Sequence, residues 1–199
     1  YYHTIGEDFY THYKLPVVTP TNALQWTDLV QSCGPFHLQE HLSGSSPLTR
    51  TSFDKQLVTV FPTDYRYGWD LSLSHHQHLL DVTHDKLQIL CHYYSVRGIP
   101  TDYYHNTPLY TWISSRIDTT RITTLHLLDK AKNTNLHKTN LHHALDNMYP
   151  HHCDLCSFGC VDHNGTPVPR VSVLMSTRPL TSVSRSCICL ASGKKHSSY

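Results

Sequence analysis

Apolar side chains recur at helical spacing along four stretches of the chain. The clearest covers residues 75–96, where Leu80, Leu87, Cys91 and Tyr94 form one stripe. Shorter stripes cover residues 21–33, 118–131 and 140–148. Because positions i, i+3, i+4 and i+7 share one face of an α-helix, this spacing predicts four helices.

Strand patterns are shorter. Residues 55–61 alternate and are rich in strand-forming types, and residues 171–175 and 183–190 predict two more strands joined near Arg178. Residues 109–113 fit either a strand or the start of a helix, and the Ser-rich residues 43–50 predict a loop. Together the two kinds of pattern predict an α+β fold.

The predicted elements divide the chain into three regions. Residues 1–20, rich in Tyr and His, predict an extended N-terminal arm, and residues 21–150 predict a mainly helical main domain. Residues 151–199 hold five of the seven cysteines and predict a small C-terminal zinc-stabilised β-hairpin module. No apolar run approaches the roughly 20 residues of a membrane-spanning helix, so we expect no membrane span. The chain begins at Tyr1, from which we expect a processed chain or a fragment.

The charge balance is nearly neutral, with 16 Lys and Arg against 15 Asp and Glu. This argues against nucleic-acid binding by bulk charge alone. The hydrophobic content of 39% supports a folded core and argues against disorder. The 18 histidines, whose ordinary pKa is about 6.5, would add positive charge in mild acid.

The composition also favours residue types with pyrimidine-rich codons. His, Tyr, Thr, Leu, Pro and Ser are common, whereas Glu, Gly, Ala and Lys are scarce. A G-poor genome would produce this bias. We therefore expect a viral protein, with an organellar ribosomal-type subunit next, and an intracellular location (host cytoplasm, virion or organelle) rather than secretion.

Two close cysteine pairs predict a zinc site in the C-terminal module. Cys153 and Cys156 form a C-x2-C pair, and Cys187 and Cys189 form a C-x-C pair. Thiolates at the ends of two turns are a common tetrahedral zinc framework. The further candidate ligands in this segment are Cys160 and His163.

Two other interpretations of these cysteines remain open. In an oxidising compartment they would form disulfides, and Asn164-Gly165-Thr166 would be a glycosylation acceptor. The chain would then be a secreted, disulfide-bonded viral glycoprotein fragment. Alternatively, the cysteines are buried as small apolar side chains without a metal.

A protease or hydrolase is the enzymatic alternative. His37, Glu40 and His41 fit the pattern H-x-x-E-H, which on a helix places two zinc ligands one turn apart with Glu as general base. Cys33 precedes Gly-Pro and resembles a protease nucleophile, but it lies where the predicted helix ends, at the unfavourable end of the dipole. A small buried residue is the simpler interpretation of Cys33.

Histidines are also dense along residues 75–96. His75, His76 and His78 begin this predicted helix and precede His84 and His92. They could be metal ligands or a pH sensor, but a solvated face produced by compositional bias explains them more simply.

The C-terminal tail is locally basic. Residues 164–199 contain no acidic residue, and the basic candidates for an RNA contact are Arg170, Arg178, Arg185, Lys194 and Lys195. Pairs of tyrosines at 93–94 and 103–104 could stack on unpaired bases, although core and interface packing explains them better.

The sequence therefore favours a non-enzymatic structural or accessory subunit of a larger assembly. We expect it to bind zinc and to contact neighbouring protein subunits, RNA or both. Phosphate-binding glycine loops and the zinc-deaminase signature are absent, so neither nucleotide use nor deamination is indicated.

Overall fold

A computed structural model of the chain describes residues 7–96, 107–117, 122–127, 140–154, 166, 171–181, 187 and 189. These residues form six α-helices and one five-stranded mixed sheet in the order β1-β2-β3-β5-β4. The mixture of helices and strands agrees with the predicted combination. None of the described helices has the length and hydropathy that a bilayer crossing requires.

The sheet changes direction at its centre. β1 (Gln39–His41), β2 (Cys91–Ser95) and β3 (Ile122–Leu127) run parallel, whereas β5 (Val171–Ser176) is antiparallel to both β3 and β4 (Tyr149–Asp154). The predicted boundary between residues 150 and 151 therefore lies inside β4.

β1 is paired along both of its edges. Its second neighbour is the extended segment Thr59–Thr63, joined through parallel bridges from Leu38 to Thr59 and from His41 to Thr63. Backbone hydrogen bonds continue this pairing, including Val60 N to Leu38 O at 2.9 Å. This pairing satisfies the backbone of β1, and all three of its residues are fully buried, although their side chains are Gln, Glu and His.

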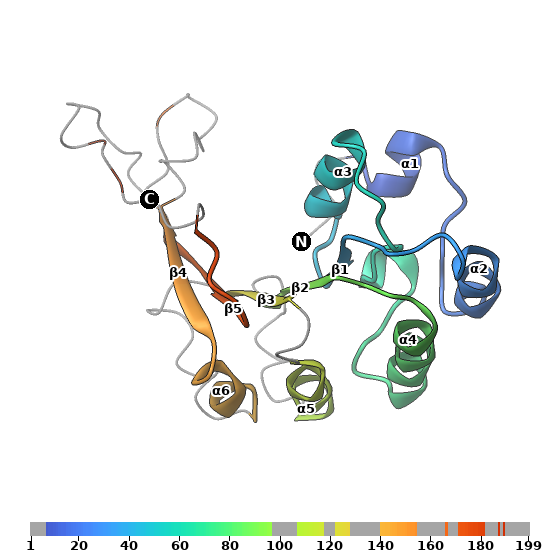
Figure 1. Cartoon of the computed structure of the whole chain (residues 1–199). Helices are drawn as coiled ribbons and strands as arrows, with labels where there is room; N and C mark the ends of the chain where they lie inside the picture. Colours follow the sequence, from blue (N-terminus) through green and yellow to red (C-terminus); the bar gives the residue numbers. More distant parts are fainter. Residues whose placement is uncertain are drawn as a thin grey trace.

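Helices cover both faces of the sheet near β1. The helices are α1 (Phe9–Tyr13), α2 (Ala23–Val30), α3 (Pro47–Asp54), α4 (Ser74–Lys86), α5 (Thr107–Arg116) and α6 (Asn140–Leu145). In Figure 1, α4, α5 and α6 lie below the sheet, and α1 and α3 lie above β1. Pro47 occupies the first turn of α3, where its missing N–H costs no hydrogen bond.

The core on the side of α2 and α4 is aromatic. Trp69 is fully buried, its ring stacks on Phe61 at 5.5 Å between centroids, and its Nε1 donates to the carbonyl of Val18 at 3.1 Å. The N-terminal residues also contribute to this core, because Phe9 and Tyr10 of α1 are buried.

Two of the predicted helices contain strands. The stretch 75–96 forms α4 only as far as Lys86, since Leu87 turns to extended angles (φ −108°, ψ 132°) and β2 follows. The stretch 118–131 contains β3, where Ile122, Thr123 and Thr124 are β-branched and favour a strand. Leu80, Leu87 and Tyr94 are all buried, so the apolar spacing correctly predicts core positions. These positions do not, however, lie on one continuous helix.

The structure confirms some of the other predicted elements fully and others only in part. The helices at 21–33 and 140–148 are confirmed as α2 and α6 with shorter bounds, and residues 109–113 lie in α5. The strand predicted at 55–61 is confirmed only in part: the backbone of residues 58–60 pairs with residues 37 and 38 beside β1, whereas residues 55–57 follow α3 without such pairing. The strand at 171–175 is confirmed as β5, but it pairs with β4, and most of 183–190 lies outside the described residues.

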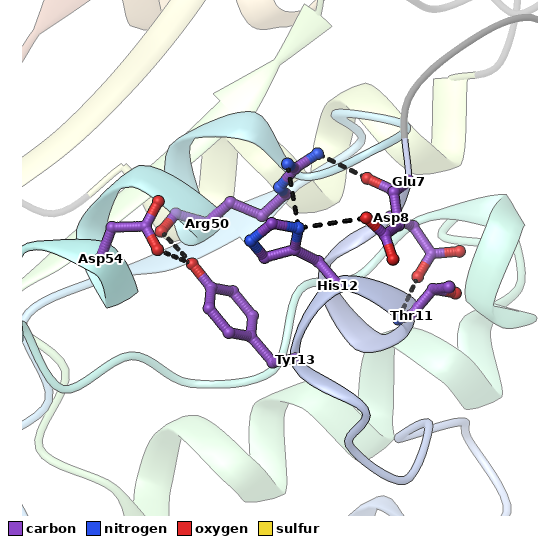
Figure 2. Close-up of polar contacts among 7 residues, drawn as sticks. All are labelled: Glu7, Asp8, Thr11, His12, Tyr13, Arg50 and Asp54. Atoms are coloured by element: carbon purple, nitrogen blue, oxygen red, sulfur yellow. Dashed lines mark hydrogen bonds and ion pairs between the residues drawn. The ribbon is translucent and has the colours of Figure 1, made fainter.

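Polar contacts attach α1 to α3. Figure 2 shows Tyr13 donating from its hydroxyl to Asp54 and to the carbonyl of Arg50, while the Arg50 guanidinium donates to the carbonyl of Glu7. Asp8 caps α1 by accepting from the amide of Thr11 at 2.9 Å. The N-terminal helix is therefore attached by hydrogen bonds as well as by its buried rings.

Replacing Tyr13 with Phe is expected to lower the free energy of unfolding by about 1 kcal/mol, the usual net contribution of such a hydrogen bond. Partial burial and the bond to Asp54 raise the pKa of Tyr13 to about 12. Because this pKa is higher in the folded state, the advantage of wild type over Tyr13→Phe is present below pH 10 and shrinks toward pH 12. Urea unfolding measures both effects.

The matched control is Tyr149→Phe, since Tyr149 is 50% exposed. We expect it to change stability by less than about 0.5 kcal/mol at either pH. A Tyr13→Phe loss that does not vary with pH would contradict the assigned bond to Asp54.

Candidate metal centre

Three histidines from different elements meet in the interior. His41 ends β1, His84 lies in the last turn of α4, and His92 is the second residue of β2. Their exposed fractions are 0%, 5% and 4%. One ring nitrogen from each lies within 4.8 Å of the others. Among the described residues, these three side chains form the group that could hold a metal ion.

The parallel register of β1 and β2 explains how the cluster forms. Gln39 lies opposite His92, and His41 lies opposite Tyr94. Paired residues point to the same face and alternate residues share a face, so these four side chains all project from one side of the sheet. α4 packs on that side and adds His84.

Each contact of the cluster links two different segments. His41 Nδ1 lies 2.7 Å from the hydroxyl of Thr63, and His41 Nε2 lies 3.3 Å from His92 Nδ1. His84 Nε2 lies 2.8 Å from Gln39 Oε1. The cluster thus joins the extended segment 59–63, β1, β2 and α4.

The spacing of the ring nitrogens suits a metal ion. Zinc binds histidine nitrogen at about 2.0–2.1 Å, and tetrahedral geometry then places two such nitrogens about 3.3 Å apart. The distance between His41 Nε2 and His92 Nδ1 equals this value. Three imidazoles without a carboxylate favour Zn²⁺, Cu²⁺ or Ni²⁺ over Mg²⁺ or Ca²⁺.

Burial holds His41 in the form that can bind a metal. Its pKa is lowered well below the ordinary value, first by burial and then by the neighbouring His92. A metal ligand must be a neutral imidazole. Two aromatic rings pack against His41. Tyr94 stacks on it at 4.4 Å between centroids, and Trp112 lies edge-on at 6.5 Å.

Glu40 points to the opposite face of β1. Its carboxylate accepts from the amides of Leu48 and Thr49, at 3.3 and 2.6 Å, and from the Thr49 hydroxyl at 2.7 Å. Burial raises its pKa, and the hydrogen bonds from Thr49 and Leu48 oppose that rise. Glu40 therefore anchors the N-terminus of α3.

The helical H-x-x-E-H arrangement predicted for His37, Glu40 and His41 is wrong. These residues lie on and just before a strand, so Glu40 and His41 project from opposite faces. His37 is exposed, and its Nδ1 accepts from the amide of Val58 at 3.2 Å. Of the three, only His41 belongs to the cluster.

The predicted cysteine ligands are only partly described. Cys153 is buried in β4, and Cys189 is also buried. The amide of Cys187 donates to Asp154 at 2.5 Å, and the amide of Cys189 donates to the sulfur of Cys187 at 3.4 Å. The structure therefore brings Cys187 beside the residue that follows Cys153. Cys156, Cys160 and His163 lie outside the described residues.

Among the described residues, none of the remaining predicted site residues belongs to the histidine cluster. Arg178 is exposed just after β5, whereas Arg170, Arg185, Lys194 and Lys195 lie outside the described residues. His75 and His78 are exposed in the first turns of α4, and Cys33 is exposed beyond the end of α2.

His84 and His92 are the ligand candidates that the sequence did not distinguish. Both fell within one predicted helix, where they counted as part of a solvated histidine-rich face. The strand-forming run Cys-His-Tyr-Tyr-Ser at 91–95 was the signal that could have separated them, because a strand there places His92 beside β1.

Comparisons with protein-family models, with curated proteins and with solved structures found no match to this chain.

Proposed function

We propose that this protein binds one zinc ion at His41, His84 and His92 as a structural centre. The observation that carries the proposal is the meeting of three imidazoles, each no more than 5% exposed, with ligand nitrogens within 4.8 Å. The described residues supply three of the four ligands of a tetrahedral ion, and we assign a structural rather than a catalytic role because burial of all three keeps substrate away from the fourth position.

The ion would connect parts of the chain that are distant in sequence. His41 and His84 are 43 positions apart, and they reach the centre from a strand and from the helix that covers it. A metal bound there would hold α4 against the sheet, in addition to the apolar contacts of Leu80 and Leu87.

Metal analysis of the purified protein tests the proposal. We expect one equivalent of zinc in wild type, retention of that zinc in Cys153→Ser, and its loss in His84→Leu. Leucine fills a similar volume under the sheet but has no nitrogen that could bind a metal. Circular dichroism confirms that the variant is folded.

The outcomes separate the two candidate centres. Two equivalents, of which one is lost in each variant, would support the histidine centre and add one at the cysteines. Absence of zinc from wild type, or zinc that survives His84→Leu and is lost in Cys153→Ser, would overturn the proposal.

The wider role remains a proposal from composition. We infer a viral or organellar assembly subunit from the bias toward residues with pyrimidine-rich codons, and a non-enzymatic one because phosphate-binding glycine loops and the zinc-deaminase signature are absent. Contact with RNA is supported by the basic, acid-free residues 164–199. Arg178 is the member of that basic set that the structure describes, and it is exposed.

A further inference from the structure

Gln39 lies between the histidine centre and the backbone of the neighbouring segment. Its side chain is fully buried, with Nε2 3.3 Å from the carbonyl of Phe61 and Oε1 2.8 Å from His84 Nε2. A carbonyl oxygen only accepts hydrogen bonds. The amide nitrogen of Gln39 must therefore face Phe61, and its oxygen must face His84.

This orientation determines the proton position on His84. Because Gln39 Oε1 is an acceptor, His84 Nε2 is the donor. A neutral imidazole protonated at Nε2 carries its lone pair on Nδ1. The chain of contacts from Phe61 through Gln39 thus selects Nδ1 of His84 as the ligand atom.

Thr63 stands in the same relation to His41. The Thr63 hydroxyl lies 2.7 Å from Nδ1 of His41 and can accept a hydrogen bond from its N–H. Nε2 of His41 then presents its lone pair toward Nδ1 of His92, 3.3 Å away, where the two nitrogens can share a metal ion. Phe61 and Thr63 both belong to the segment that pairs with the outer edge of β1.

We propose that Gln39 is a positioning residue of the metal centre, which fixes the ring orientation and tautomer of His84 so that Nδ1 binds zinc. The inference rests on the proposed zinc-binding function. Metal-binding histidines commonly donate their second N–H to a carboxylate or carbonyl oxygen, and loss of that acceptor typically lowers metal affinity 10–100-fold. Here a neutral amide supplies the acceptor.

The test is the zinc affinity of Gln39 variants, measured by competition with a chromophoric chelator. We expect Gln39→Leu to weaken zinc binding about 10–100-fold. Gln39→Glu keeps an oxygen acceptor for His84 but loses the donor to Phe61, and it should bind zinc more tightly than Gln39→Leu. The absorption spectrum of bound Co²⁺ should change in Gln39→Leu, because the geometry of His84 is no longer fixed.

Gln77→Leu is the matched control. Gln77 also donates from its side chain to a backbone carbonyl, that of Leu71 at 2.8 Å, but it lies outside the histidine centre. We expect its zinc affinity and Co²⁺ spectrum to equal those of wild type. A general loss of structure would instead affect both leucine variants.

A direct measurement does not depend on any variant. Long-range ¹H–¹⁵N spectra of the zinc-loaded wild type should show His84 protonated at Nε2 and bound to metal through Nδ1. Zinc binding by wild type with the opposite assignment, or with unchanged affinity and spectrum in Gln39→Leu, would overturn the role of Gln39 and leave the zinc centre intact. A wild type without zinc would overturn the function beneath it.

Discussion

Replacement of Glu40 by Ala is expected to lower the free energy of unfolding by about 2–4 kcal/mol, because the hydrogen-bond donors around its buried carboxylate lose their acceptor. The carboxylate accepts three hydrogen bonds, from the amides of Leu48 and Thr49 and from the Thr49 hydroxyl. In the variant these donors lose their acceptor inside the protein, which costs about 1–3 kcal/mol for each buried group left unsatisfied.

The position of Glu40 adds to this effect. The amides of Leu48 and Thr49 belong to the first turn of α3, where the positive end of the helix dipole favours a negative side chain. Glu40 is thus the connection between β1 and the start of α3. Its removal should weaken α3 and, through Tyr13 and Arg50, the attachment of α1.

Two further variants make the measurement specific. Glu40→Gln retains one oxygen acceptor and should cost about 1–2 kcal/mol, because one of the remaining donors then faces an amide nitrogen. Glu7→Ala is the matched control, since Glu7 is exposed and its contact with His12 is a surface pair worth less than about 1 kcal/mol. Urea unfolding that gives Glu40→Ala a loss no greater than that of Glu7→Ala would contradict the anchoring role.

Glu40 also illustrates which parts of the fold the sequence could supply. The apolar stripes at 21–33 and 140–148 predict the correct helices, because local spacing is sufficient for isolated amphipathic segments. β1 has no such signal. A fully buried strand made of Gln, Glu and His breaks the usual rule that buried positions are apolar. Its tertiary contacts explain it, because Glu40 accepts from Thr49 of α3 and Gln39 accepts from His84 of α4.

The stretch 75–96 shows why the candidate site was missed. Leu80 in α4, Leu87 just after it and Tyr94 in β2 are all buried. Their helical spacing continues past Leu87, where the helix has ended. Periodicity alone therefore could not distinguish one long helix from a helix followed by a strand. That difference decides whether His84 and His92 lie on a solvated face or converge on His41.

The sequence predicts cysteine rather than histidine ligands for a similar reason. Pairs such as Cys153 and Cys156 are conspicuous because their spacing is local, whereas the three histidines meet only through tertiary structure. His41 was recognised as a zinc candidate, but with His37 and Glu40 as its partners. The true neighbours lie 43 and 51 positions further along the chain.

Zinc is expected to raise the free energy of unfolding of the metal-depleted protein by about 4 kcal/mol when free zinc exceeds the dissociation constant 1,000-fold. A ligand that binds only the native state stabilises it by this mass-action term, and the native state alone brings His41, His84 and His92 together. The unfolded chain carries 18 histidines and 7 cysteines that bind zinc weakly, so the measured increment should fall somewhat below that value.

His92→Gln and His37→Gln form the matched pair for this measurement. Both replace one histidine in or beside the sheet, but His92 is 4% exposed within the cluster, whereas His37 is exposed outside it. Urea unfolding with chelator and with added zinc should give a large increment for wild type and His37→Gln and almost none for His92→Gln. An equal increment in all three would mean that zinc acts elsewhere on the folded chain. The comparison of increments also removes any difference in stability between the metal-free variants, because each protein serves as its own reference.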